Sequence, residues 1–131
     1  MKKMNPVVHF EMPAEDTMRM TKFYSKVFGW KAQQMGEEMG NYVEISTSEG
    51  DEKGMPKVPG MINGGFYKKT PDGPHPSFVI AVDDLKASIQ EVNDAGGKVL
   101  AEPMDIPGIG KFVPFEDTEG NKCSMLQPLM K

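Results

Sequence analysis

The residues with the clearest chemical capacity near the N-terminus are a histidine and a glutamate two positions apart. His9 and Glu11 lie in an extended stretch that ends at Pro13. Because successive side chains of a strand point to opposite faces, His9 and Glu11 share one face of a sheet. This spacing is typical of a general acid/base pair, or of part of a metal site that is completed from elsewhere. A hydrogen-bonded polar pair on a solvated sheet face is the alternative interpretation.

Two further side chains could extend this pair. Glu44 alternates with Val43 and Ile45 in an extended stretch, so it points away from the core, either into the same site or into solvent. His75 could supply a second histidine, but the prolines on both sides of it favour a surface linker. Glu44 is therefore a candidate for ligand contact, and His75 is expected outside the site.

Strand alternation in the second half of the chain adds small and apolar candidates for ligand contact. Ser77 and Val79 share the site-facing side of one predicted strand, and Ser124 takes that side of the last strand. Cys123, next to Ser124, then points to the core, which predicts a buried and unreactive thiol. The sequence contains no nucleophile elbow and no Ser-His-Asp motif, so a serine hydrolase is not expected.

The composition limits the kinds of function. The chain has 131 residues with two histidines and one cysteine, so a metal site built mainly from these types has three candidate ligands at most. Its 15 Lys/Arg and 19 Asp/Glu give a net charge of −4, which argues against a nucleic-acid-binding surface. An unpaired cysteine and the lack of a signal-peptide or membrane-spanning pattern predict a cytoplasmic protein.

The apolar pattern predicts that a β-α-β-β-β unit carries His9 and Glu11. The first strand leads to Asp16, a residue type that caps helices, and helical spacing of apolar residues then continues to Gly29. One apolar face of this helix is formed by Met20, Phe23, Tyr24, Val27 and Phe28. The other strands are predicted at 30–35, 41–47 and 60–68.

The same pattern restarts after a proline-rich linker at 69–76. It predicts a strand at 77–82, a helix capped by Asp84, and strands at 98–103, 110–116 and 121–127. The residues Phe10, Asp16 and Gly29 recur 68 positions later as Phe78, Asp84 and Gly97. The sequence therefore predicts an α+β protein of two tandem βαβββ modules, residues 6–68 and 77–128, that form one domain over 1–131.

The residues at these joints resemble a known superfamily. The stretches HFEMP (9–13), KFY (22–24) and VFGW (27–30), together with VDDL (82–85) and FEDTEGN (115–121), are similar to the vicinal oxygen chelate superfamily. That superfamily contains glyoxalase I, bleomycin-resistance proteins and extradiol dioxygenases. The resemblance covers about residues 6–128 and implies that the two modules form a curled sheet cup with helices outside.

The resemblance also implies four metal-ligand positions, one on the first and one on the last strand of each module. His9 stands at the first of them. The others fall at Ser77, at Ser124, and at Gly64 or Gly65, which are poor replacements for histidine and carboxylate. No cofactor is therefore expected, with a divalent metal at His9 as the alternative.

Three functions follow from these residues and from the resemblance. The first is a glyoxalase/bleomycin-resistance-like protein that binds a small, partly apolar molecule near His9 and Glu11 without the four-ligand metal. The second is a metal-dependent lyase, isomerase or dioxygenase, with His9 as one ligand and Glu11, Glu44 or His75 as others. The third is a non-enzymatic interaction module. A small-molecule partner and a homodimer are expected, with no nucleic-acid or membrane partner.

Overall fold

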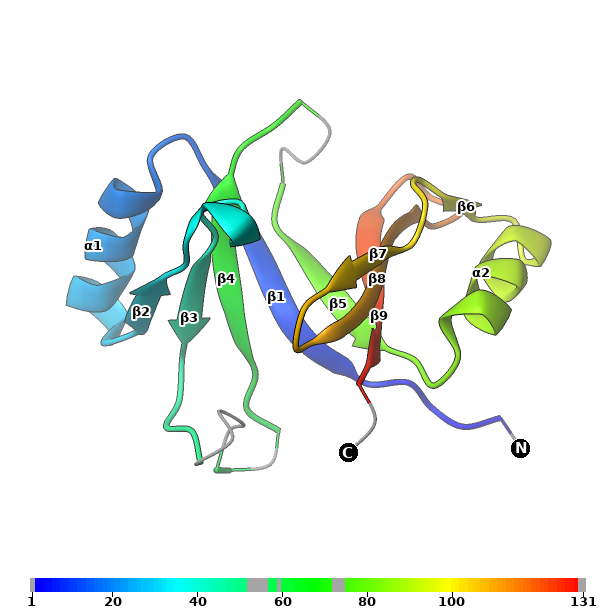
Figure 1. Ribbon diagram of the computed structural model, residues 1–131, viewed down its shortest axis with the longest axis horizontal. Helices are drawn as coiled ribbons and strands as arrows, with labels where there is room; N and C mark the ends of the chain where they lie inside the picture. Colours follow the sequence, from blue (N-terminus) through cyan, green and yellow to red (C-terminus); the bar gives the residue numbers. More distant parts are fainter. Residues whose placement is uncertain (1, 52–56, 59, 72–74, 130–131) are drawn as a thin grey trace. The chain divides into compact units, whose positions relative to one another are not determined.

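The computed structural model describes residues 2–51, 57–58, 60–71 and 75–129 (Figure 1). The described chain forms two compact units, one of residues 9–76 and one of residues 2–8 with 77–129. Residues 6–8, which the sequence assigns to the first module, thus belong with the second unit. Among the described residues, no helix is long and apolar enough to cross a membrane.

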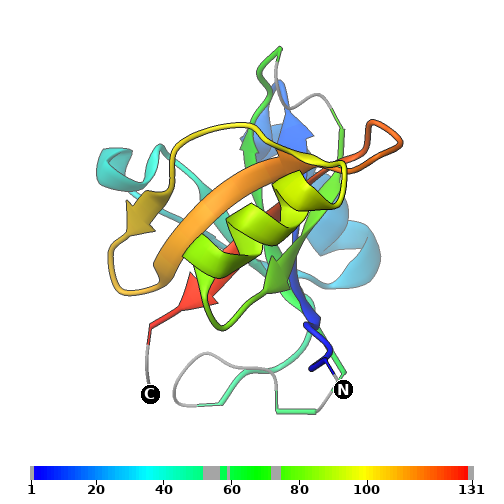
Figure 2. The same cartoon turned by 90° about the vertical axis from the view of Figure 1, so that its right-hand side faces the viewer.

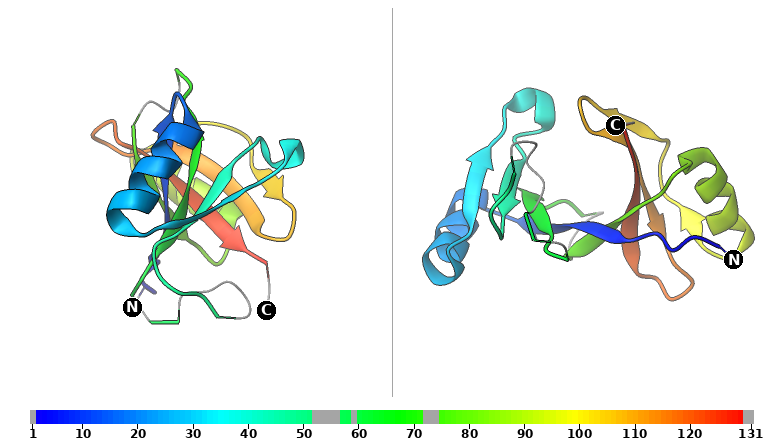
Figure 3. Two further views of the ribbon diagram at one scale, coloured as in Figure 1. Left: turned by 90° about the vertical axis from the view of Figure 1, so that its left-hand side faces the viewer. Right: turned by 90° about the horizontal axis from the view of Figure 1, so that it is seen from below.

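The first module has the predicted β-α-β-β-β order. Its sheet runs β2-β3-β4-β1, with β1 parallel to β4 and the other pairs antiparallel. The helix α1 packs on one face of this sheet, as the left view of Figure 3 shows. Its elements are β1 (Val7–Ala14), α1 (Thr17–Phe28), β2 (Lys31–Gln34), the short 3-10 helix η1 (Glu37–Met39), β3 (Val43–Ser46) and β4 (Asn63–Lys68).

The core of this module lies between α1 and the sheet. Phe66 is completely buried, and Val43 and Ile45 are 3% and 2% exposed, as their alternation in the sequence predicts. Tyr24 of α1 stacks on Trp30 with 4.7 Å between ring centroids. The aromatic rings of helix and sheet therefore hold α1 in place.

The boundaries of α1 match its sequence signals. The Asp16 carboxylate accepts a hydrogen bond from the Arg19 backbone N–H at 3.0 Å. Gly29 ends the helix in the left-handed conformation, at φ +72°. The predicted apolar face is buried only in part, because Phe23, Val27 and Phe28 are 54%, 54% and 60% exposed.

The second module repeats the order with one additional strand. Its strands run β5-β9-β8-β6, and β7 also pairs with β8. Figure 2 shows α2 lying across β8 and β9, where Leu85 and Met125 belong to the core. The elements are β5 (Ser77–Ala81), α2 (Leu85–Asp94), β6 (Lys98–Val99), β7 (Met104–Ile106), β8 (Gly110–Glu116) and β9 (Lys122–Pro128).

The single strand predicted at 98–103 is wrong. β6 covers only Lys98–Val99, and the chain returns to β8 as β7 at Met104, opposite Phe112. Pro103 has no backbone N–H and cannot donate a ladder hydrogen bond, which separates the two strands. A turn follows β8, in which the Asp117 carboxylate accepts hydrogen bonds from the backbone N–H groups of Glu119 and Asn121.

Candidate functional site

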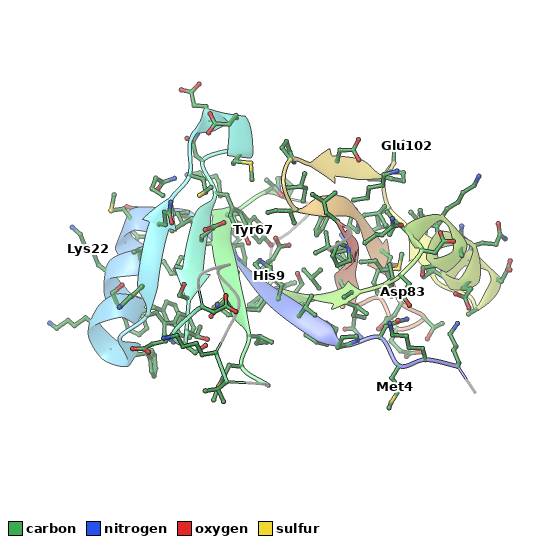
Figure 4. The ribbon with its side chains drawn as sticks, turned by 60° about the horizontal axis from the view of Figure 1, so that its bottom comes forward. Met4, His9, Lys22, Tyr67, Asp83 and Glu102 are labelled. Carbon is green, nitrogen blue, oxygen red and sulfur yellow. The ribbon has the colours of Figure 1, made fainter. Side chains whose placement is uncertain are left out.

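The candidate site lies on the face of the module-one sheet that is opposite to α1. His9 and Glu11 of β1 are partly buried on this face, while Phe10 and Met12 pack into the core on the other face. The alternation predicted from the sequence therefore holds along β1. Figure 4 labels His9 on β1 and Tyr67 on the neighbouring strand β4.

A tyrosine connects the two predicted residues. The Tyr42 hydroxyl lies 2.8 Å from His9 Nε2 and donates a hydrogen bond to Glu11 Oε2 at 3.3 Å. Its ring stacks on the His9 ring, with 6.4 Å between the centroids. A hydroxyl both donates and accepts, so it can pass a proton between a carboxyl oxygen and an imidazole nitrogen. His9, Tyr42 and Glu11 form one hydrogen-bonded unit, which we call the bridged triad.

Two glycines of β4 make room for aromatic rings on the two faces of the sheet. Gly65 pairs with Glu11 and with Glu44, and a methyl group added to Gly65 would overlap the Tyr42 hydroxyl and ring. A methyl group on Gly64 would instead meet the Phe10 ring, 2.6 Å from its nearest carbon, on the core face. Of the two glycines expected at a family ligand position, Gly65 is therefore the one on the face of His9.

The loop between β2 and β3 positions Tyr42. The Tyr42 carbonyl accepts a hydrogen bond from the Met35 N–H at 2.8 Å, and the Tyr42 N–H donates one to the Met39 carbonyl at 3.3 Å. The Gln34 side-chain amide donates to the Asn41 carbonyl at 2.8 Å. Asn41 has φ +58°, a left-handed conformation that asparagine tolerates better than most residues. Sequence reasoning did not propose a role for Tyr42, although its alternation with Val43 puts it on the site face.

Burial shifts the protonation equilibria of the bridged triad toward neutral forms. It lowers the pKa of His9 and raises the pKa of Glu11, although the hydrogen bond from Tyr42 opposes the second shift. The pKa of Tyr42 is raised far above its ordinary value by burial and by the negative charge of Glu11. The pKa of Tyr67 is raised by burial and then by Glu11. A neutral imidazole beside a carboxyl that retains its proton more readily is an arrangement suited to general acid/base chemistry.

The raised pKa of Glu11 predicts a pH-dependent effect of the Glu11→Gln substitution on stability. As pH rises through the unfolded-state pKa toward the folded-state pKa, the unfolded chain releases this proton first, so stability falls. Glutamine keeps the shape and has no proton to release. We expect the melting temperature of the variant to exceed that of the wild type at pH 7, and this difference to shrink below about pH 4. Calorimetry at both pH values measures these melting temperatures. A difference between variant and wild type that is the same at both pH values would contradict the prediction.

The remaining predicted residues are not members of the bridged triad. Glu44 is exposed on β3, although its charge contributes to the raised pKa of Tyr42. His75 is exposed before β5, as the prolines predict, and its backbone carbonyl accepts a hydrogen bond from the Tyr67 hydroxyl at 3.4 Å. Ser77, Val79 and Ser124 belong to the second unit, where Val79 pairs with Ser124.

The donor set of module one does not fit a metal ion held by several protein ligands. In the part of the chain that the structure describes, no three His, Cys, Asp or Glu side chains are grouped as metal ligands. His9 Nε2 is engaged by the Tyr42 hydroxyl, and Gly65 offers no side-chain donor. A catalytic metal needs about three protein ligands and an open position, which these residues do not supply.

The thiol of Cys123 is buried, as the sequence predicts. Burial is the main cause of its raised pKa, which keeps the thiol protonated. The side chain next to it in β9, Ser124, is only 5% exposed. A nucleophilic role for Cys123 is therefore not supported.

Known proteins resemble this chain in sequence and in fold. The family model described as the Glyoxalase/Bleomycin resistance protein/Dioxygenase superfamily matches residues 7–125. A glyoxylase-like domain-containing protein of Didymella fabae is 37% identical over 116 residues, which cover 85% of this chain and 84% of that protein. The "Probable lactoylglutathione lyase, chloroplastic" of Arabidopsis thaliana is 29% identical over 92% of this chain, but the match spans only 35% of that longer protein.

Solved structures show the same fold at low sequence identity. A hypothetical protein from Bacillus halodurans superposes with a TM-score of 0.71 at 13% identity, with 98% of each chain covered. Methylmalonyl-CoA epimerase of Streptomyces coelicolor, in complex with 2-nitronate-propionyl-CoA, gives a TM-score of 0.70 at 14% identity and covers 98% of this chain and 100% of its own. The match of the family model over most of the chain, together with this fold, shows that the chain belongs to the vicinal oxygen chelate, or Glyoxalase/Bleomycin resistance protein/Dioxygenase, superfamily.

Proposed function

We propose that this chain binds a small, partly apolar molecule on the His9/Glu11 face of module one and moves a proton on it without the four-ligand metal. The observation that carries this proposal is the bridged triad, in which the Tyr42 hydroxyl contacts both His9 Nε2 and Glu11 Oε2. The superfamily supplies the general expectation of a small-molecule site. The residues of this chain supply the acid/base character.

The triad can hold its protons in two arrangements. In one, the His9 imidazolium donates its Nε2–H to the Tyr42 oxygen, and the Tyr42 hydroxyl donates to Oε2 of the ionised Glu11 carboxylate. In the other, Glu11 carries the proton and donates to Tyr42, whose hydroxyl donates to His9 Nε2. Switching between them makes Glu11 a proton acceptor or a proton donor toward a bound molecule, for example at a carbonyl oxygen or at a carbon next to it.

A metal-dependent lyase, isomerase or dioxygenase is the second candidate, since members of the superfamily often use a divalent ion. It would require His9 to release Tyr42 and other ligands to be recruited. The measurement that separates it from the first is the metal content of the purified protein. If the purified protein contains a stoichiometric divalent ion, and His9→Ala loses both the ion and the activity, the metal-dependent function replaces the metal-free proposal.

Several finer predictions stay proposals. The chain is proposed to act as one domain made of both modules and as a homodimer in the cytoplasm. Light scattering coupled to size-exclusion chromatography measures the oligomeric state. Ligand contacts of Glu44, Ser77, Val79 and Ser124 are also proposed, and alanine substitution of each should weaken binding less than substitution of Glu11.

The proposed function is tested by thermal unfolding in the presence of a panel of small carbonyl metabolites. Lactoylglutathione and methylmalonyl-CoA are included as probes because the names of similar proteins contain these compounds. We expect at least one compound of the panel to raise the melting temperature, and both His9→Ala and Glu11→Ala to remove the effect. A panel without any hit, or a hit that both variants retain, would favour the interaction module.

A further inference from the structure

Tyr42 occupies the part of the sheet face where a metal ion bound to His9 would need space. Its ring lies over Gly65, the position on β4 beside Glu11, and its hydroxyl lies 2.8 Å from His9 Nε2. Glu11 Oε2 accepts from the same hydroxyl at 3.3 Å. The His9 imidazole nitrogen and the Glu11 carboxylate oxygen therefore both face the phenol.

The contacts of Tyr42 are incompatible with metal binding at His9 Nε2. An imidazole nitrogen binds a metal through its lone pair, which requires that nitrogen to be free of a proton and of a competing partner. A metal could reach His9 Nε2 only after the Tyr42 hydroxyl and ring had left the space over Gly65.

We propose that Tyr42 is a positioning residue that closes this sheet face to divalent metal ions and thereby keeps His9 and Glu11 as a metal-free pair. The Tyr42 side chain then prevents metal binding directly, in addition to the lack of ligand side chains at the other family positions. The inference rests on the proposed function for the place of the ligand. Its test uses a metal ion alone, so the two can fail separately.

The test is a titration of the full chain with Co²⁺ alone, followed by the visible absorption of the bound ion. Wild type and Tyr42→Phe, which retains the ring, are expected to show no binding that depends on His9. Tyr42→Ala removes the ring, and Tyr42→Ala with Gly65→Glu also adds a carboxylate beside Glu11. We expect the double variant to bind Co²⁺ roughly 10–100-fold more tightly than wild type, and addition of His9→Ala to abolish this gain.

Matched variants keep the result interpretable. Tyr42→Ala with Gly65→Gln has the same shape without the added charge and should bind Co²⁺ more weakly than the glutamate variant. If the double variants do not fold, as judged by circular dichroism, Tyr42→Ala alone decides, since it should bind Co²⁺ more tightly than wild type. The proposal is overturned if Tyr42→Ala binds Co²⁺ no more tightly than wild type, or if Tyr42→Phe binds as tightly as the double glutamate variant.

Discussion

Glu11→Gln is expected to lower the turnover of a substrate identified in the binding panel by about 10²–10⁴-fold, the usual contribution of a general acid or base. Glutamine has nearly the shape of glutamate and still accepts the hydrogen bond from Tyr42. It cannot take up or release the proton that Glu11 exchanges. The loss should therefore appear in kcat, with little change in KM.

The control for this prediction is a carboxylate of the same unit that lies outside the bridged triad. Glu37 is exposed in η1, and Glu37→Gln should retain the turnover of the wild type. Steady-state kinetics of the three proteins would measure both effects. Equal turnover in Glu11→Gln and wild type would show that Glu11 only binds or only shapes the site.

Phe66→Ala is expected to lower the free energy of unfolding by about 3–5 kcal/mol, the range for removal of a fully buried phenylalanine side chain. Phe66 is 0% exposed and belongs to the module-one core together with Val43 and Ile45. Its ring also contacts Tyr24 of α1, with 5.6 Å between centroids. A cavity at this place removes contacts with both the sheet and the helix.

The matched control is a phenylalanine of α1. Phe23 is 54% exposed, so Phe23→Ala should change the free energy of unfolding by about 1 kcal/mol or less. Denaturant unfolding monitored by the fluorescence of Trp30, which lies in module one, measures both variants. Equal effects of the two substitutions would contradict the assignment of Phe66 to the core.

The order of elements could be predicted from the sequence because its signals are local. Alternation around Val43 and Ile45 marked β3, and the caps Asp16 and Asp84 marked the starts of the two helices. Each of these signals depends on residues within a few positions. The predicted α+β fold of two βαβββ modules is confirmed for this reason.

The features that the sequence did not reveal depend on long-range pairing. β7 forms because Met104 pairs with Phe112 across a turn, and nothing within residues 98–103 indicates where the strand breaks except Pro103. The burial of α1 was overestimated because helical spacing does not show how much of an apolar face the sheet covers. Phe23 and Val27 remain exposed for this reason.

Two of the three residues of the bridged triad, His9 and Glu11, were predicted from the sequence. Alternation was sufficient for His9 and Glu11, which are two positions apart. Tyr42 could be identified only with the register that places Gly65 beside Glu11, because the missing side chain at Gly65 is what admits the ring. A glycine pair in a strand indicates that something approaches closely, but the sequence does not say which residue does so.

The central claim is that His9, Tyr42 and Glu11 act as one connected unit. Nitrogen NMR of the imidazole side chains tests it most directly, because the chain has only two histidines and so gives few signals. We predict that His9 stays neutral to a lower pH than a free imidazole and that Tyr42→Phe shifts its Nε2 resonance. A His9 that titrates like a free imidazole, with an Nε2 resonance that Tyr42→Phe does not change, would contradict the account.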